Sequence, residues 1–203
     1  MEIESINVKN DGYVRCKSNF YSAFDILQHE RSYTFSIGIN MLTGDIDCGN
    51  WAVSYMLSMY KYRPKDFILF EEPNVIVNGD SIPLSEMSEY CCYMDDLHPL
   101  FNKRCTVKKL VTRALHYNKI NYSCEDVRNL FCISKDRFEK PLKAVGNESL
   151  KAMAAIAFSH NKEIFCFPWL SSSRFENYHS NLSGLLQILE NLNKIVIMPV
   201  GHL

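Results

Sequence analysis

The last 55 residues alternate twice between a helical and a strand-like pattern, and this alternation constrains the fold more than any other feature of the chain. The alanine-rich segment SLKAMAAIAFSH (149–160) is a strong helix former, and it leads into the apolar run EIFCF (163–167). A polar stretch, SSSRFENYHSN, precedes a second helical segment, LSGLLQILENL (182–192), and the chain closes with the β-rich run KIVIMPV (194–200). Helix, strand, helix and strand in this order predict βα units on a mainly parallel sheet, and therefore an α/β fold.

The first part of the chain consists of short strand-like runs. INVKN (6–10) and YVRCKS (13–18) flank Asp11-Gly12, which predicts a hairpin between them. YTFSIGI (33–39) is β-branched and aromatic, as in a buried strand, and Asn78-Gly79 supplies a tight turn after the strand candidate VIVNG (75–79). These runs predict a β-rich start of the chain.

Helical patterns occupy the middle of the chain. Val53, Met56, Leu57 and Tyr60 have helical spacing, and they predict a helix directly after the glycine-containing loop TGDIDCGN (43–50). Further helices are predicted over three ranges: 106–118, 124–132 and 135–143. We expect one domain over 1–203, because domains usually run to about 100–200 residues.

Composition narrows the function classes. With 22 Lys+Arg against 23 Asp+Glu the net charge is −1, which argues against a nucleic-acid binder that works by broad phosphate neutralisation. Eight cysteines without a CxxC pair predict neither a disulfide framework nor a structural zinc site, and the adjacent Cys91 and Cys92 are expected to be buried structural thiols. No signal peptide is visible, and no apolar run approaches the ~20 residues of a membrane span. The expectation is a reduced, cytoplasmic protein without direct membrane insertion.

The strand–loop–helix around residue 44 has the outline of a phosphate-binding loop, G-x-x-x-x-G-K-[ST]. Gly44 and Gly49 have the required spacing, and they would let backbone N–H groups meet phosphate oxygens at a helix N-terminus. Asn50 stands where that motif has its lysine, and Trp51 stands where a small hydroxyl holds Mg²⁺. A P-loop kinase or GTPase requires a lysine at this position, so the absence of its positive charge argues against both enzyme classes.

Downstream segments follow the order of a known family. VIVNGDSI, CYMDD, PLFNKRCTV and KKLVTRAL resemble successive pieces of the ABC-transporter nucleotide-binding domain, and the resemblance covers essentially the whole chain. It implies a P-loop NTPase-like ABC ATPase core with a mainly parallel sheet, an antiparallel β portion and a helical insert over approximately 95–150. The family's Q-loop glutamine falls on Asp96.

The same resemblance places the remaining family motifs. AVGNESLKAMAAIAFSH resembles the signature sequence with its helix, with Gly146 at the first signature glycine and Asn147 at the second. EIFCF takes the place of the Walker B strand, so that Pro168 falls where the Walker B aspartate stands and Trp169 where the catalytic glutamate stands. The family's switch histidine falls on Val200. Asp95-Asp96 with His98 forms a compact acidic and histidine cluster, which we interpret as a solvated loop.

The resemblance and these substitutions together predict a pseudo-ATPase. We expect a catalytically inactive ABC ATPase-like subunit that pairs with an ABC ATPase subunit, as a homo- or heterodimer, and with a membrane permease at the inner face of the cell membrane. No cofactor is expected, apart from weak ATP or ADP binding through the Gly44 and Gly49 amides, and no metal. The alternative is a stand-alone regulatory or scaffold protein that kept the fold but neither nucleotide nor transporter binding.

Overall fold

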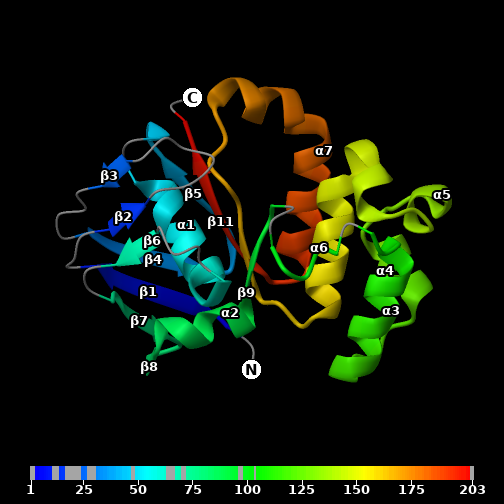
Figure 1. Ribbon diagram of the computed structural model, residues 1–203, viewed down its shortest axis with the longest axis horizontal. Helices are drawn as coiled ribbons and strands as arrows, with labels where there is room; N and C mark the ends of the chain where they lie inside the picture. The colour runs from blue at the N-terminus through cyan, green and yellow to red at the C-terminus, as the bar shows by residue number, and fades with distance from the viewer. Residues whose placement is uncertain are drawn as a thin grey trace.

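The computed structural model describes residues 3–10, 14–16, 24–26, 31–46, 49–62, 67–69, 72–95, 98–102 and 104–201 (Figure 1). The strands are β1 (Ser5–Asn10), β2 (Val14–Cys16), β3 (Phe24–Ile26), β4 (Arg31–Ser36), β5 (Gly38–Thr43), β6 (Phe67–Leu69), β7 (Asn74–Val77), β8 (Asp80–Ile82), β9 (Cys91–Tyr93), β10 (Ile164–Cys166) and β11 (Ile195–Val200). The α-helices are α1 (Asn50–Met59), α2 (Met87–Tyr90), α3 (Val107–Asn118), α4 (Cys124–Leu130), α5 (Lys135–Phe138), α6 (Ser149–Ser159) and α7 (Ser172–Asn191). One parallel and two antiparallel sheets combine with these helices, so the predicted α/β class is confirmed.

The parallel sheet forms the centre of the fold. Its strand order is β5-β11-β10-β9, and every neighbouring pair is parallel. All residues of β9, β10 and β11 are buried, because other layers cover both faces of the sheet. The order α6, β10, α7, β11 matches the helix and strand alternation that the sequence predicts for its last 55 residues.

Successive residues of the parallel strands enter two separate hydrophobic cores, since side chains alternate between the faces of a sheet. On one face the core includes α1 and the antiparallel sheet, and the strands contribute Cys91, Tyr93, Ile164, Cys166, Ile195 and Ile197. On the other face the core includes α3, α4, α6 and α7, and the strands contribute Cys92, Phe165, Val196, Met198 and Val200. Figure 1 shows these helices on the side of the sheet away from α1.

Helix α1 lies between the parallel sheet and the antiparallel sheet. It packs against β9, β10 and β11, and nine of its ten residues are buried. The antiparallel strands β1 and β7 supply Ile6, Val8, Val75 and Val77 to the same core. A helix enclosed in this way must be apolar nearly all round, as the sequence WAVSYMLSM is.

The predicted hairpin between the first two strands is wrong. β1 pairs with β4 on one side and with β7 on the other, so that the sheet order is β4-β1-β7-β8. β2 pairs instead with β3 and β6 in a second antiparallel sheet. Long-range pairing has overridden the local turn signal of Asp11-Gly12, which lies outside the described residues. The other turn is confirmed: Asn78 and Gly79 have φ of 51° and 94° and join β7 to β8.

The run 33–39 is divided between two strands rather than forming one. Gly38 has a φ of 100°, a conformation that side chains disfavour, and the chain changes sheet here from β4 to β5. The Asn40 side chain stabilises the change, because its Nδ2 donates to Ser36 O at 2.8 Å and its Oδ1 accepts from Ser36 N at 3.2 Å. The prediction that this run is extended is confirmed, but the prediction of a single strand is wrong.

Helix α7 is longer than the sequence predicts. The polar stretch 171–181 is helical from Ser172 onward and continues without a break into the apolar segment 182–191. In the apolar part, Leu182, Leu185 and Leu189 reach the core, and Phe175 of the polar part also packs against it. The apolar spacing therefore predicted only the second half of a continuous helix.

Helices α3, α4 and α5 lie between β9 and α6 in the chain, and α3 packs along α6 (Figure 1). Helices α3 and α4 agree with the predicted ranges and have side-chain caps at Thr106 and Ser123. Helix α5 ends at Phe138, well short of the predicted residue 143, and Pro141 cannot continue a helix. Among the described residues, no helix has the length and apolar character needed to cross a bilayer.

Candidate functional site

Because the central strands are parallel, their carboxyl ends meet at one edge of the sheet, which is where open α/β sheets bind ligands. This edge brings together three positions that the sequence singles out. The Gly44 N–H donates to Val200 O at 2.9 Å, and Trp169 Nε1 donates to Gly44 O at 3.2 Å. The loop after β5, the end of β11 and the segment after β10 are thus in direct contact.

The side chain that follows the second glycine of the loop is directed at the backbone that precedes the loop. Gly49 begins α1 with a φ of 78°, in the left-handed region that favours glycine. The next side chain, Asn50, is buried, and its Nδ2 donates to Thr43 O at 3.1 Å. The amide that stands at the lysine position therefore closes the loop onto the end of β5.

Trp51 is directed into the core instead of into a cavity. Its side chain is 1% exposed, and Nε1 donates to Ile46 O at 2.9 Å. Its ring lies edge-on to Tyr55, with centroids 6.4 Å apart, and Tyr55 lies edge-on to Tyr93 of β9 at 5.2 Å. Such edge-to-face contacts are favourable beyond the area they bury, so the three rings tie the loop to two elements of the fold.

The segment after β10 closes the edge from the other side. Pro168 and Trp169 follow the strand, Leu170 pairs with Val200, and Gly201 N donates back to Leu170 O at 2.8 Å. A Cβ at Gly201 would lie 3.2 Å from Ser172 N and 3.4 Å from the Trp169 ring. No local sequence pattern marks Gly201, because nothing nearby in the chain distinguishes a glycine that a distant contact requires.

The sequence ranges that supply this edge carry little positive charge. The sequence has no lysine or arginine over 32–60, 164–173 or 195–203, the ranges that supply the glycine loop and the ends of β10 and β11. Enzymes that transfer phosphoryl groups place lysine and Mg²⁺ on the phosphates. Within the described part of the chain, no three His, Cys, Asp or Glu side chains are grouped as metal ligands.

The interpretation of the segment after β9 as a solvated loop is wrong for His98. Asp96, at the Q-loop position, lies outside the described residues, but His98 is only 2% exposed. Its Nδ1 accepts from Leu100 N at 3.3 Å, and the rings of Tyr62 and Phe101 pack against it. Burial, with smaller contributions from Lys162 and His160, lowers the pKa of His98 to about 3.

The signature positions lie apart from this edge. Gly146 and Asn147 are exposed just before α6, and Gly146 has a φ of 70°. The next residue, Glu148, accepts from Ser134 N at 3.0 Å and lies 3.5 Å from an Arg137 nitrogen, which fixes it to the start of α5. None of the hydrogen bonds that join Gly44, Trp169 and Val200 reaches Gly146 or Asn147.

The adjacent cysteines are buried structural thiols, as predicted. Cys91 and Cys92 are both 0% exposed and lie in β9, where they face the two different cores. Burial raises the pKa of both thiols, so neither is a thiolate at neutral pH. They contribute to packing and not to a reactive pair.

The central parallel sheet, the antiparallel sheet and the helices α3–α7 together define a fold of the ABC ATPase type. The chain is similar over 98% of its length to 92% of a Pyrococcus furiosus protein assigned as an ABC transporter ATP-binding protein, with a TM-score of 0.59 and 15% identity. It is also similar over its whole length to a bacterial Atm1-family ABC exporter solved with ATP bound, with a TM-score of 0.58 and 11% identity, and it spans 35% of that exporter. No protein-family model and no curated protein sequence matches the chain. Similarity at these identities shows the fold.

The Asn50 contact can be tested by one substitution. Asn50→Asp replaces the buried donor to Thr43 O with an oxygen, and we expect it to lower the free energy of unfolding by about 1–3 kcal/mol. Urea denaturation measures the change. Asn147→Asp is the matched control at an exposed position, with an expected change within about 0.5 kcal/mol. Equal effects of the two substitutions would contradict this role of Asn50.

His98 predicts a pH dependence of stability. Below the ordinary histidine pKa of 6.5 the unfolded chain takes up a proton that the folded chain resists until about pH 3. His98 by itself should therefore lower the free energy of unfolding by up to about 1.4 kcal/mol for each pH unit between its unfolded pKa of 6.5 and its folded pKa of about 3. Urea titrations between pH 7 and pH 4 measure this slope. His98→Gln should make it shallower, whereas His116→Gln retains His98 and should leave its contribution intact.

Proposed function

We propose that the chain is a catalytically inactive ABC ATPase-like subunit that acts by protein–protein contact. The observation that carries this proposal is the closure of the glycine loop on itself. Three side-chain N–H donors, from Asn50, Trp51 and Trp169, are directed at the backbone carbonyls of the loop and of the strand that precedes it. A loop that binds phosphate presents backbone N–H groups to the ligand, and here the Gly44 N–H already donates to Val200 O.

Charge supports the same proposal. The transition state of phosphoryl transfer is stabilised by cations and by a carboxylate that orients water, and the loss of one comparable electrostatic group costs on the order of 10²–10³ in rate. Asn50, Pro168 and Trp169 stand where the resemblance puts the lysine and the two carboxylates. Three such losses in one site leave no reasonable route to hydrolysis there.

Nucleotide affinity should be low for a separate reason. Of the two glycine amides expected to retain weak ATP or ADP binding, that of Gly44 donates to Val200 O. A nucleotide would have to break this hydrogen bond and displace the Trp169 indole from Gly44 O. Each hydrogen bond contributes about 0.5–1.5 kcal/mol, so the two together reduce affinity by about one order of magnitude or more.

A partner subunit would explain why a chain that does not hydrolyse ATP has the ABC ATPase fold. In the family that the chain resembles, each nucleotide site is built from the P-loop of one subunit and the signature of the other. The exposed Gly146 and Asn147 are available to face such a partner, which would be an ABC ATPase subunit bound with it to a membrane permease. This role implies a cytoplasmic protein held at the membrane through that complex.

The nucleotide part of the proposal is tested by isothermal titration of the full chain with ATP, with and without Mg²⁺. We expect no saturable binding at micromolar nucleotide and no phosphate release above that of a mock preparation, purified in the same way from cells that do not express the chain. The mock preparation is the control for contaminating ATPases, which would contribute equally to both. Micromolar affinity that depends on Mg²⁺ would contradict the proposal.

The second candidate function is a stand-alone regulatory or scaffold protein. The observation that favours it is Glu148, whose carboxylate is held by Ser134 and Arg137 next to the segment that a nucleotide of a partner would approach. Co-purification from the native host distinguishes the two. We expect an ABC ATPase subunit or a permease to remain bound to the wild-type chain; their absence beside another stable partner would favour the scaffold.

A further inference from the structure

The helical part of the chain carries an excess of positive charge. Between residues 104 and 151 the sequence has eleven Lys or Arg and five Asp or Glu, whereas the whole chain has 22 and 23. This segment is therefore basic, and the remainder of the chain is acidic. Helix α3 lies in the basic segment and contains no acidic residue.

The positive charges on the exposed side of α3 destabilise the helix. Lys108 and Lys109 occupy the first turn, where the helix dipole favours acidic side chains by about 0.3–1 kcal/mol each. Lys109 and Arg113 are four residues apart, so that like charges are neighbours on the helix surface, which is also destabilising. Folding does not require this pattern, and a role in binding would explain it.

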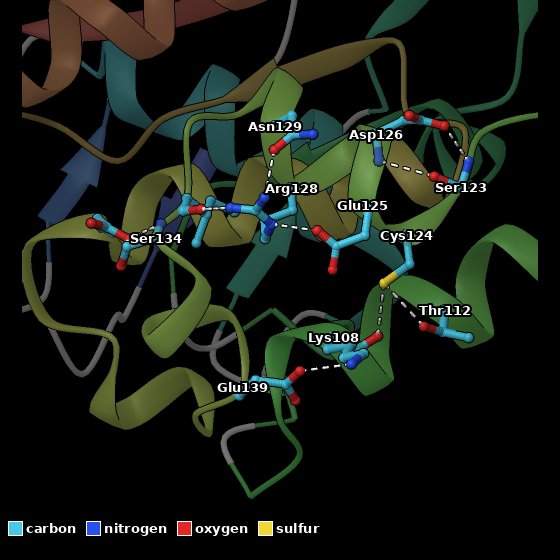
Figure 2. A network of polar contacts seen from close by, with 12 residues as sticks. Lys108, Thr112, Ser123, Cys124, Glu125, Asp126, Arg128, Asn129, Ser134 and Glu139 are labelled. Carbon is cyan, nitrogen blue, oxygen red and sulfur yellow. Dashed lines mark hydrogen bonds and ion pairs between the residues drawn. The ribbon is translucent and has the colours of Figure 1, made fainter.

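One flank of α3 is already engaged within the chain. Lys108 Nζ forms an ion pair with Glu139 at 2.6 Å, and Thr112 Oγ1 donates to Cys124 Sγ at 3.2 Å (Figure 2). The neighbouring flank consists of Lys109, Arg113, His116 and Tyr117, all exposed, and we call it the α3 face. The side chains of the α3 face form no ion pair or hydrogen bond with any described residue.

Tyr117 gives the α3 face an apolar component. Its side chain is 83% exposed, the highest exposure among the large hydrophobic side chains of the described chain. It lies four residues after Arg113 and therefore next to it on the helix surface. Tyrosine and arginine are the side chains most enriched, with tryptophan, among those that dominate binding energy at protein interfaces.

We propose that the α3 face binds an acidic segment of a partner protein. Carboxylates of the partner pair with Lys109 and Arg113, and an apolar side chain packs on Tyr117. The face spans about 12 Å from residue 109 to residue 117, which suits a short peptide segment. This inference rests on the proposed function only in that both need a protein partner.

The amount of charge favours a protein over other anionic partners. Lys109 and Arg113 are the two permanent charges of the α3 face. Polybasic sites for anionic lipid have about 4–8 lysines and arginines, and nucleic-acid binders make about 6–10 phosphate contacts. Three other cations of the segment are paired: Lys108 with Glu139, Arg128 with Glu125 and Arg137 with Glu148.

The test is an NMR titration of the full, ¹⁵N-labelled chain with a synthetic peptide of about fifteen residues that alternates Glu or Asp with Leu and Tyr. We expect chemical-shift changes centred on α3 that weaken as salt is raised. Lys109→Glu with Arg113→Glu should reduce the affinity at least about tenfold, and Tyr117→Ala about threefold or more, with an unchanged fold.

A second double variant serves as the matched control. Lys135→Glu with Lys143→Glu makes the same change in charge at exposed positions outside α3 and should leave the affinity within about twofold. An equal loss of peptide affinity in both double variants would contradict the proposal that the α3 face is the binding site. Tighter binding to phosphatidylserine vesicles or to single-stranded RNA than to the peptide would contradict the proposal of a protein partner. The partner would then be a membrane or a nucleic acid. The test uses no nucleotide, so its failure is independent of the nucleotide prediction.

Discussion

The burial of the parallel sheet on both faces is the constraint on which the rest of the structure depends. Helix α1 and the antiparallel sheet cover one face, and α3, α4, α6 and α7 cover the other. Because β9, β10 and β11 are completely buried, their ends are fixed in position and their carboxyl ends meet at one edge. The positions singled out in the glycine loop and after β10 are brought together by this packing, since they are far apart in the chain.

At the same edge, side-chain donors close on the backbone of the glycine loop. Gly49 has a left-handed conformation, and helix α1 begins directly after it. The side chains at 50, 51 and 169 then satisfy backbone carbonyls that would otherwise lie unpaired in an apolar environment. These contacts stabilise the edge without any ligand.

Charge is distributed unevenly between the two ends of this architecture. The ranges 32–60, 164–173 and 195–203 at the carboxyl edge of the sheet hold no lysine or arginine, whereas the helical segment that packs on α6 is basic and exposes Arg113 and Tyr117 side by side. A protein that bound nucleotide would concentrate positive charge at the first location. This chain concentrates it at the second, which is consistent with a function exercised through protein contact.

The sequence by itself determined the α/β class, the helices α3, α4 and α6, the turn at Asn78-Gly79 and the order of the last four elements, because each depends on local propensity or on the period of apolar residues. Only the tertiary structure decided the partners of β1, the division of 33–39 at Gly38, the burial of His98 and the need for glycine at 201. Each of these depends on contacts between residues distant in the chain, which no local pattern encodes. The sequence identified Asn50 and Trp51 as positions of interest. It could not predict that their side chains donate to the backbone carbonyls of Thr43 and Ile46.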